Sequence, residues 1–193
     1  MTPILCIRRE QYKNKPSDGS RHWKIASARA TAEAMLTVLI HDVRDAATLA
    51  IGLPPLISGA VEGIVRDVVV LDVSESDARR LAEHAGCRLE AEAECLRHVD
   101  RLKGDWVLVL AAGVRLGEGW MDDTIRHVSA GSPGSRHRPL LLPEAGPRTL
   151  RQRLLGPRRG GRLLPKGELA KLAQAGSGLA TIERMRPVRA PRG

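Results

Sequence analysis

The chain has 193 residues, which is enough for one domain with a sizeable hydrophobic core and additional terminal segments. Its longest apolar runs are of strand length, well below the roughly 20 residues of a membrane-spanning helix, and its first residues are not expected to form a signal peptide. Three cysteines without metal-ligand spacing complete the pattern of a reduced, cytoplasmic protein.

The net charge of +9 is distributed unevenly along the chain. Residues 36–130 carry 10 basic and 16 acidic side chains, whereas residues 131–193 carry 14 basic and 3 acidic ones. This C-terminal segment is either a weakly ordered Arg-rich tail or a contact for an anionic membrane surface, which would make the protein peripheral at the inner face of the membrane. Nucleic acid is the less favoured partner because none of the four Trp and Tyr residues lies in the segment.

Residues 1–35 are polar and charged, with 7 basic and 3 acidic side chains, and predict a poorly ordered basic N-terminal extension. Met35 is followed at once by the first convincing strand. We therefore expect Met35 to be the natural start of the protein and residues 1–34 to come from an over-extended reading frame.

From residue 36 onwards, short β-branched apolar runs alternate with helical patterns. The expected strands and helices are, in chain order, 36–40, 46–58, 68–71, 77–86, 87–89, 90–103, 106–111 and 120–129. Pro54 and Pro55 are expected to kink or break the first helix. The alternation predicts an α/β fold, a mostly parallel sheet with helices on both faces.

The C-terminal part of the chain has weaker patterns. Residues 131–139 form a breaker segment, and residues 140–142 and 162–165 are expected strands. A helix is expected over 166–175, and Gly176 would end it. Residues 181–193 are predicted to be a disordered basic tail.

Residues 67–86 are the segment around which the chain is organised. An apolar strand leads directly into Asp72, and a helix follows from about Asp77 to Gly86, with Ser74 or Ser76 expected to cap its first turn. Ligands of such sheets bind at the carboxyl ends of the strands, which is where Asp72 stands. The alternative role for Asp72 is a cap for the next helix, and for Asp77 a favourable contact with the helix dipole.

Three motifs in this order resemble a known family. Residues 36–45 (LTVLIHDVRD) are similar to its opening strand, residues 69–77 (VVLDVSESD) to its V-V-D-x-x-S-x-D element, and residues 104–120 (GDWVLVLAAGVRLGEGW) to the strand that ends in its D-x-D motif. By their order and spacing the chain resembles the family-2 glycosyltransferases, which have the GT-A fold. The likeness is good over 36–130 and loose over 131–180, which together define the expected GT-A-like domain.

This resemblance implies transfer of a sugar from a nucleotide-diphospho-sugar to an acceptor hydroxyl. Asp45 and Asp72 match positions that contact the nucleoside in the family. The family's D-x-D acids hold Mg²⁺ or Mn²⁺, but Ala111, Ala112 and Gly113 stand in their place and have no ligating side chain. The motif is therefore degenerate, and we expect no metal site and no metal cofactor.

Two residues are candidates for the remaining chemistry. His41 lies at the end of the first strand and is a candidate general base, because an imidazole in general titrates near neutrality; the alternative is a structural histidine. Arg115 follows the degenerate motif and can offset the charge of a diphosphate, unless it is a solvated loop residue. The family's late acidic base has no clear match among Glu144, Glu168 and Glu183.

Three readings stay open: a glycosyltransferase of doubtful catalytic competence, a non-catalytic nucleotide-binding pseudoenzyme or scaffold, and a basic-tailed binder of nucleic acid or a membrane surface. The donor sugar and the acceptor are not encoded in these motifs.

The proposed start at Met35 can be checked on the native protein. We expect mass spectrometry of its N-terminus to find a chain that begins at residue 35. A peptide covering residues 10–30 would contradict this expectation.

Overall fold

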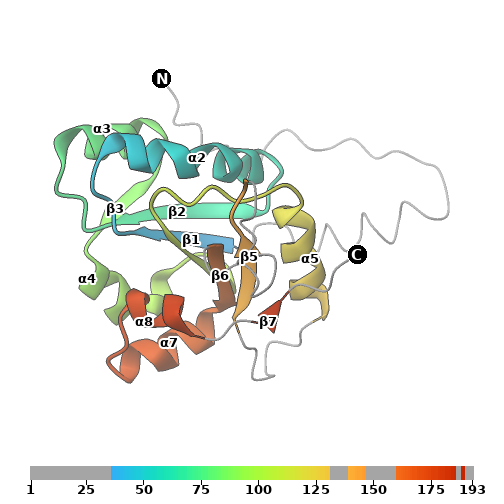
Figure 1. Ribbon diagram of the computed structural model, residues 1–193. Helices are drawn as coiled ribbons and strands as arrows, with labels where there is room; N and C mark the ends of the chain where they lie inside the picture. Colours follow the sequence, from blue (N-terminus) through green and yellow to red (C-terminus); the bar gives the residue numbers. More distant parts are fainter. Residues whose placement is uncertain (1–35, 131–138, 147–159, 186–187, 190–193) are drawn as a thin grey trace, which may run out of the picture.

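The computed structural model describes residues 36–130, 139–146, 160–185 and 188–189 (Figure 1). The predicted extension over residues 1–35 and most of the breaker segment lie outside the described residues, as does much of the basic C-terminal segment. The expected contact with a membrane surface therefore stays a prediction.

Strands and helices alternate in the described part of the chain. The strands are β1 (Leu36–His41), β2 (Val65–Leu71), β3 (Arg88–Glu90), β4 (Trp106–Ala111), β5 (Leu140–Pro143), β6 (Gly160–Pro165) and β7 (Val188–Arg189). The helices are α2 (Ala46–Val61), α3 (Ser76–His84), α4 (Glu92–Arg97), the 3-10 helix η1 (Val99–Arg101), α5 (Trp120–Ala130), α7 (Lys166–Gln174) and α8 (Leu179–Arg184).

All seven strands belong to one sheet, in the order β3-β2-β1-β4-β6-β5-β7. β3, β2, β1 and β4 are parallel neighbours, whereas β6 is antiparallel to both β4 and β5. Among the described strands, β6 is the one that runs in the opposite direction, since β7 is parallel to β5. The predicted α/β fold with a mostly parallel sheet is confirmed.

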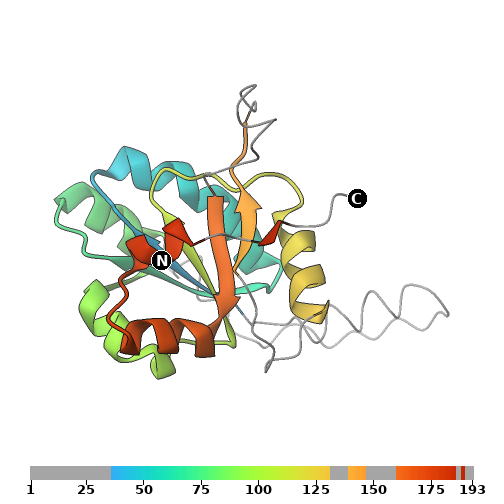
Figure 2. The same cartoon turned by 60° about the horizontal axis from the view of Figure 1, so that its bottom comes forward.

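Both faces of this sheet are covered by helices (Figures 1 and 2). In β1, Val38 and Ile40 belong to the core beneath α2, α3 and α5, while Leu39 belongs to the core beneath α4, α7 and α8. Alternate side chains of β2 and β4 divide between the two cores in the same way. Strands buried on both faces are apolar at every position, which explains the continuous apolar runs in the sequence.

Pro54 and Pro55 do not break the helix, because α2 continues through both residues to Val61. The alternative expectation of a kink stays a prediction. The carbonyls that lose a hydrogen bond to these prolines belong to Ala50 and Ile51, which are exposed, so water can satisfy them. On the other side of the helix, buried leucines hold it against the sheet: Leu49, Leu53 and Leu56.

The helix expected over 90–103 is divided into α4 and η1 by His98, whose backbone (φ −119°, ψ 45°) is not helical. Within this range Cys95, Val99 and Leu102 are buried, whereas Ala93 is exposed. Because His98 interrupts the helix, the buried positions do not follow one continuous helical repeat from residue 90 to residue 103.

The boundary predicted at residue 180 lies inside a helix. α8 extends to Arg184, so residues 181–184 are not part of a disordered tail. Leu179 and Ile182 are fully buried under the sheet. Their three-residue spacing places both side chains on one face of this short helix, which packs against the sheet. The remaining division of the chain stays a prediction.

Within the described ranges, none of the helices combines the length and the apolar character needed to cross a bilayer.

Gly59 allows a close contact between α2 and the rest of the core. A Cβ there would lie 2.8 Å from two ring atoms of Trp120 and 2.9 Å from Val65 Cγ2. We expect Gly59→Ala to lower the free energy of unfolding by about 1–3 kcal/mol through overpacking.

Gly167, near the start of α7, has open space around it. Gly167→Ala should therefore raise stability by up to about 1 kcal/mol. Urea unfolding of both variants checks the pair, and equal stability of Gly59→Ala and the wild type would contradict the described contact.

Candidate active site

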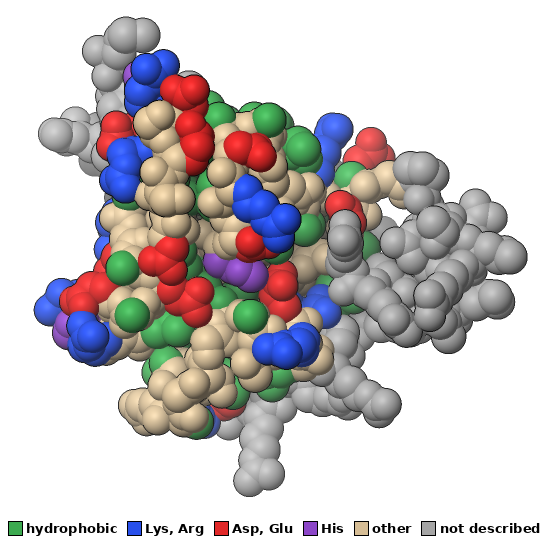
Figure 3. Space-filling view, turned by 60° about the vertical axis from the view of Figure 1, so that its left-hand side comes forward, with side chains coloured by type: hydrophobic (Ala, Val, Ile, Leu, Met, Phe, Trp, Pro, Cys, Tyr) green, Lys and Arg blue, Asp and Glu red, His purple; other side chains and the backbone are tan. Residues whose placement is uncertain are grey.

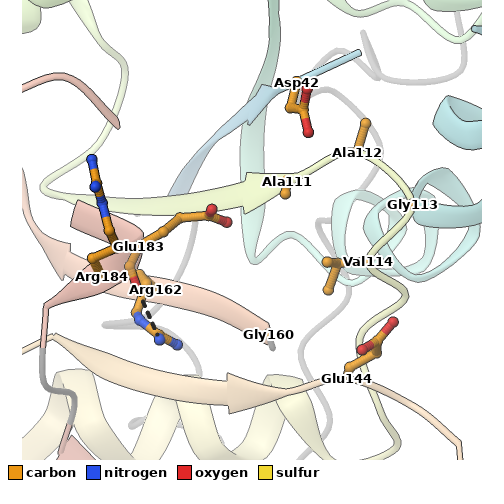
Figure 4. A pocket seen from close by; sticks show the side chains of 10 residues that line it. All are labelled: Asp42, Ala111, Ala112, Gly113, Val114, Glu144, Gly160, Arg162, Glu183 and Arg184. Carbon is orange, nitrogen blue, oxygen red and sulfur yellow. Dashed lines mark hydrogen bonds between the residues drawn. The ribbon is translucent and has the colours of Figure 1, made fainter. Parts of the chain in front are cut away.

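A pocket of about 400 Å³ lies at the carboxyl ends of β1 and β4 (Figure 4). Its lining comes from the loop after β1, the turn after β4, the end of β5, β6 and α8. The lining residues are Asp42, Ala111, Ala112, Gly113, Val114, Glu144, Gly160, Arg162, Glu183 and Arg184. Segments more than 140 residues apart in the sequence thus meet at one edge of the sheet.

Asp42 and Asp72 directly follow β1 and β2, and both have positive φ angles, of 56° and 50°. Aspartate adopts this left-handed conformation more readily than most residues, and such backbone outliers concentrate at functional sites. Because β1 and β2 are parallel neighbours, the two acids lie at the same edge of the sheet. Figure 3 shows this side of the molecule, where acidic side chains gather around a hollow.

The Asp72 carboxylate is exposed, and Oδ1 accepts a hydrogen bond of 3.1 Å from the N–H of Glu92 at the start of α4. It does not cap α3, which Glu75 caps by accepting hydrogen bonds from the N–H groups of Asp77 (2.9 Å) and Ala78 (2.6 Å). The expected serine cap was therefore wrong: Ser76 is already helical, and the longer Glu75 side chain reaches two backbone donors at once. Gly86 ends the helix with φ 79°, as predicted.

Asp45 is the N-cap of α2. Its Oδ1 accepts a hydrogen bond of 2.6 Å from the Thr48 N–H, and hydrogen bonding to Thr48 lowers the pKa of the carboxyl below its ordinary value of 3.8. The side chain is exposed and does not line the pocket. Its predicted role in nucleoside binding is untested, but its capping role alone explains an acid at this position.

His41 lies behind the pocket, with 8% of its surface exposed. Its Nε2 is 3.4 Å from Oε1 of Glu183, which does line the pocket and points toward Ala111 (Figure 4). The contact with the His41 imidazole is the main cause that lowers the pKa of Glu183 below 4.5, and the charge of Arg162 adds to it. At neutral pH the pocket therefore contains an ionised Glu183 supported by His41.

Arg162, on β6, is buried and lines the same pocket. Its Nη2 donates a hydrogen bond of 3.0 Å to the backbone carbonyl of Glu183. Burial lowers the pKa of the guanidinium, and the Glu183 charge opposes that shift. Arg162 thus holds the end of α8 against β6.

Arg115 is exposed and is not among the pocket-lining residues. The Arg115 backbone is fixed by a hydrogen bond of 2.7 Å, which its carbonyl accepts from the Ala145 N–H. The cationic side chains that the structure does bring to the pocket are Arg162 and Arg184.

Sequence reasoning missed five charged residues of the pocket: Asp42, Glu144, Arg162, Glu183 and Arg184. Asp42 follows its strand just as Asp72 follows the next one, and this parallel was a usable signal. Glu144 and Glu183 were noted as acids without context, and Arg162 only as part of a strand. Their context is tertiary: β6 and α8 return to the edge where β1 and β4 end.

The turn after β4 offers no side chain to a metal ion. The Val114 N–H donates to the Ala111 carbonyl (3.2 Å), and Gly113 adopts φ 83° within this turn. The pocket carboxylates come from separate elements, and no group of three or more His, Cys, Asp or Glu residues in the described part of the chain has a metal-binding arrangement. The described residues do not fit a divalent cation, and the expected absence of a metal cofactor stays a prediction.

Neither described cysteine suits a nucleophile. Burial raises the pKa of Cys87 and of Cys95 to about 12, so both are protonated thiols at neutral pH.

No protein-family model and no curated protein matches this chain. Solved structures do. Glucosyl-3-phosphoglycerate synthase from Mycobacterium tuberculosis in complex with Mn²⁺, UDP and glucosyl-3-phosphoglycerate is similar with a TM-score of 0.50 and 16% identity, over 80% of this chain and 64% of the synthase. The same enzyme with Mn²⁺ and UDP-glucose has a TM-score of 0.51 and 16% identity, over 79% and 62%. A mycobacterial protein has a TM-score of 0.52 and 16% identity, over 80% and 59%.

These similarities show the fold. The chain has a GT-A-like fold, as the sequence motifs predicted, and one of the solved structures it resembles is a glucosyl-3-phosphoglycerate synthase in complex with UDP-glucose. The chain spans less than two thirds of the length of these structures.

Glu183 should make stability depend on acid pH. Since its folded-state pKa is lowered, it stabilises the fold above its ordinary pKa of 4.5, and this contribution is lost as the pH falls through the folded-state value. We expect Glu183→Gln to be less stable than the wild type near neutrality and the two to converge in acid. Urea unfolding as a function of pH measures this. Glu168→Gln, on α7 and outside the pocket, is the control, and parallel curves for the wild type and Glu183→Gln would contradict the pairing with His41.

Proposed function

We propose that the chain is a glycosyltransferase-like protein that binds a nucleotide-diphospho-sugar where β1, β2 and β4 end. The supporting observation is the position of the pocket, at the carboxyl ends of parallel strands in a GT-A-like sheet. Asp72, exposed at the end of β2, is the proposed contact for the nucleoside, with Asp45 from the neighbouring loop. Their carboxylates can accept hydrogen bonds from ribose hydroxyls or from a base.

In the proposed reaction, an acceptor hydroxyl oxygen forms a bond to the anomeric carbon of the donor. The bond between that carbon and the diphosphate oxygen breaks, and its electron pair leaves with the nucleoside diphosphate. The hydroxyl proton passes to Glu183, the pocket carboxylate that lies 3.4 Å from His41. His41 would then orient this base and stabilise its charge, which reverses the sequence prediction that His41 itself is the base.

The charge of the diphosphate is the main obstacle to this reaction. Arg162 and Arg184 line the pocket, but so do the carboxylates of Asp42, Glu144 and Glu183. The two guanidinium groups are the cations available to oppose the developing negative charge. Because carboxylates and guanidinium groups line the pocket together, we expect the diphosphate to be bound weakly. Most of the affinity for the nucleotide would then come from contacts to the nucleoside.

A non-catalytic nucleotide-binding protein is the second candidate, and two observations favour it. Ala111 to Gly113 have no side chain that can ligate a metal, and the lowered pKa of Glu183 makes it a weak base. Incubation with UDP-sugars separates the candidates. Turnover that Glu183→Gln abolishes supports the transferase, whereas nucleotide binding without turnover supports the pseudoenzyme.

We expect UDP or GDP to bind to the wild type and Asp72→Asn to weaken that binding about tenfold or more, the value of one charge-assisted hydrogen bond. Asparagine tolerates the left-handed backbone and can still accept the hydrogen bond from Glu92, so the fold is preserved. Calorimetry measures the affinity, and Asp77→Asn, on the exposed first turn of α3, is the matched control. Equal affinity of Asp72→Asn and the wild type would remove Asp72 from the site.

Binding of the nucleoside diphosphate should depend little on a metal ion, because the turn after β4 has no ligating side chains. We expect replacing Mn²⁺ with a chelator to change the affinity for UDP less than about threefold. A strong Mn²⁺ requirement would show that other residues hold the ion, and would contradict this reading of the turn.

A further inference from the structure

Two short helices, α4 and the pocket-lining α8, are capped by side chains from elsewhere in the chain. Ala91 and Gly178, the N-cap residues of α4 and α8, make no side-chain capping bond. Instead, Asp72 Oδ1 accepts from the Glu92 N–H at 3.1 Å, and Glu92 Oε1 accepts from the Leu179 N–H at 2.9 Å. Each otherwise unpaired backbone donor is satisfied by the preceding member of a chain of hydrogen bonds.

This chain of hydrogen bonds ends at the start of α8, the helix that carries the pocket residues Glu183 and Arg184. α8 has six residues, too few for a stable isolated helix, so its place depends on contacts at its ends and on its buried face. Glu92 holds the first residue, Leu179, and Arg162 holds the carbonyl of Glu183 at 3.0 Å. Between them, the helix directs the Glu183 carboxylate toward His41 and into the pocket.

We propose that Glu92 is a positioning residue: by binding the start of α8 it fixes where the Glu183 carboxylate lies in the pocket. The proposal rests on the proposed function only for the chemical use of Glu183. Glu92 itself is outside the pocket lining and lies 87 positions from Leu179 in the chain. It thereby connects the strand end that carries Asp72 to the helix that carries Glu183.

Gly178 supports this assignment independently. A Cβ at Gly178 would lie 3.0 Å from Glu92 Oε1, while the backbone there (φ −75°, ψ 168°) suits any residue. Gly178→Ala therefore pushes on the Glu92 carboxylate without deleting it and without backbone strain.

The test follows the carboxyl of Glu183 by ¹³C NMR during a pH titration of the full chain. The charged groups facing Glu183 are His41 on β1, Asp42 after it, and Arg162 on β6. In Glu92→Ala we expect the pKa of Glu183 to rise toward 4.5, because α8 shifts and the contact with His41 weakens. Removing a negative charge alone would lower the pKa, so a rise reports position and not charge.

Matched variants complete the experiment. Glu92→Gln keeps an oxygen that accepts from Leu179 and should leave Glu183 with its lowered pKa, and Gly178→Ala should raise that pKa part of the way. Glu94→Ala, on the same helix but paired with Arg97 and His98, should have no effect. If Glu92→Ala does not fold, the Gly178→Ala variant is titrated in its place. Faster hydrogen exchange of the Leu179 amide in that variant shows that the bond from Leu179 to Glu92 has been weakened.

An unchanged Glu183 titration in folded Glu92→Ala, or in Gly178→Ala, overturns the proposal. The titration uses neither nucleotide nor sugar. Its outcome is therefore separate from a failure of UDP or GDP to bind, which would overturn the proposed function alone.

Discussion

Burial of β1 and β4 on both faces is the constraint on which the rest of this structure depends. Their side chains belong alternately to two cores, so neither face of the central sheet can be left to solvent. Helices must then cover both sides, and the chain can present polar groups only where the strands end. The position of the pocket at the carboxyl ends of β1 and β4 follows from this constraint before any particular chemistry is considered.

Much of this architecture could be predicted from local patterns. The run from Trp106 to Ala111 matched its strand at both ends, and the helix ending before Gly86 was found from its left-handed glycine. These signals are reliable because each depends on the residues themselves: continuous apolar runs for buried strands, and a positive φ for the residue after a helix. Pro54 and Pro55 misled because the cost of a proline depends on whether water reaches the freed carbonyls.

The site was less predictable because its chemistry comes from elements that meet only in the folded chain. Asp72 was found at a strand end, but Glu183 is on a six-residue helix whose place depends on contacts with Glu92 and Arg162 as well as on its own buried Leu179 and Ile182. His41 was identified as a candidate from its position at a strand end. Its burial next to Glu183 could not be predicted, because Glu183 reaches it only through the folding of α8 against the sheet. Single-sequence patterns describe neighbours along the chain, and these contacts are long-range.

The left-handed turn at Gly113 limits which side chains can stand at the end of β4. A Cβ at this position would face Thr48 Cγ2 at 3.0 Å with φ 83°, so an acid placed there would be strained as well as crowded. Ala111, at the end of its strand, has no such restriction on its backbone. Placing a pair of metal-binding acids at Ala111 and Gly113 would therefore require the loop to refold together with the substitution. This backbone makes a D-x-D sequence hard to introduce at the end of β4 by single substitutions.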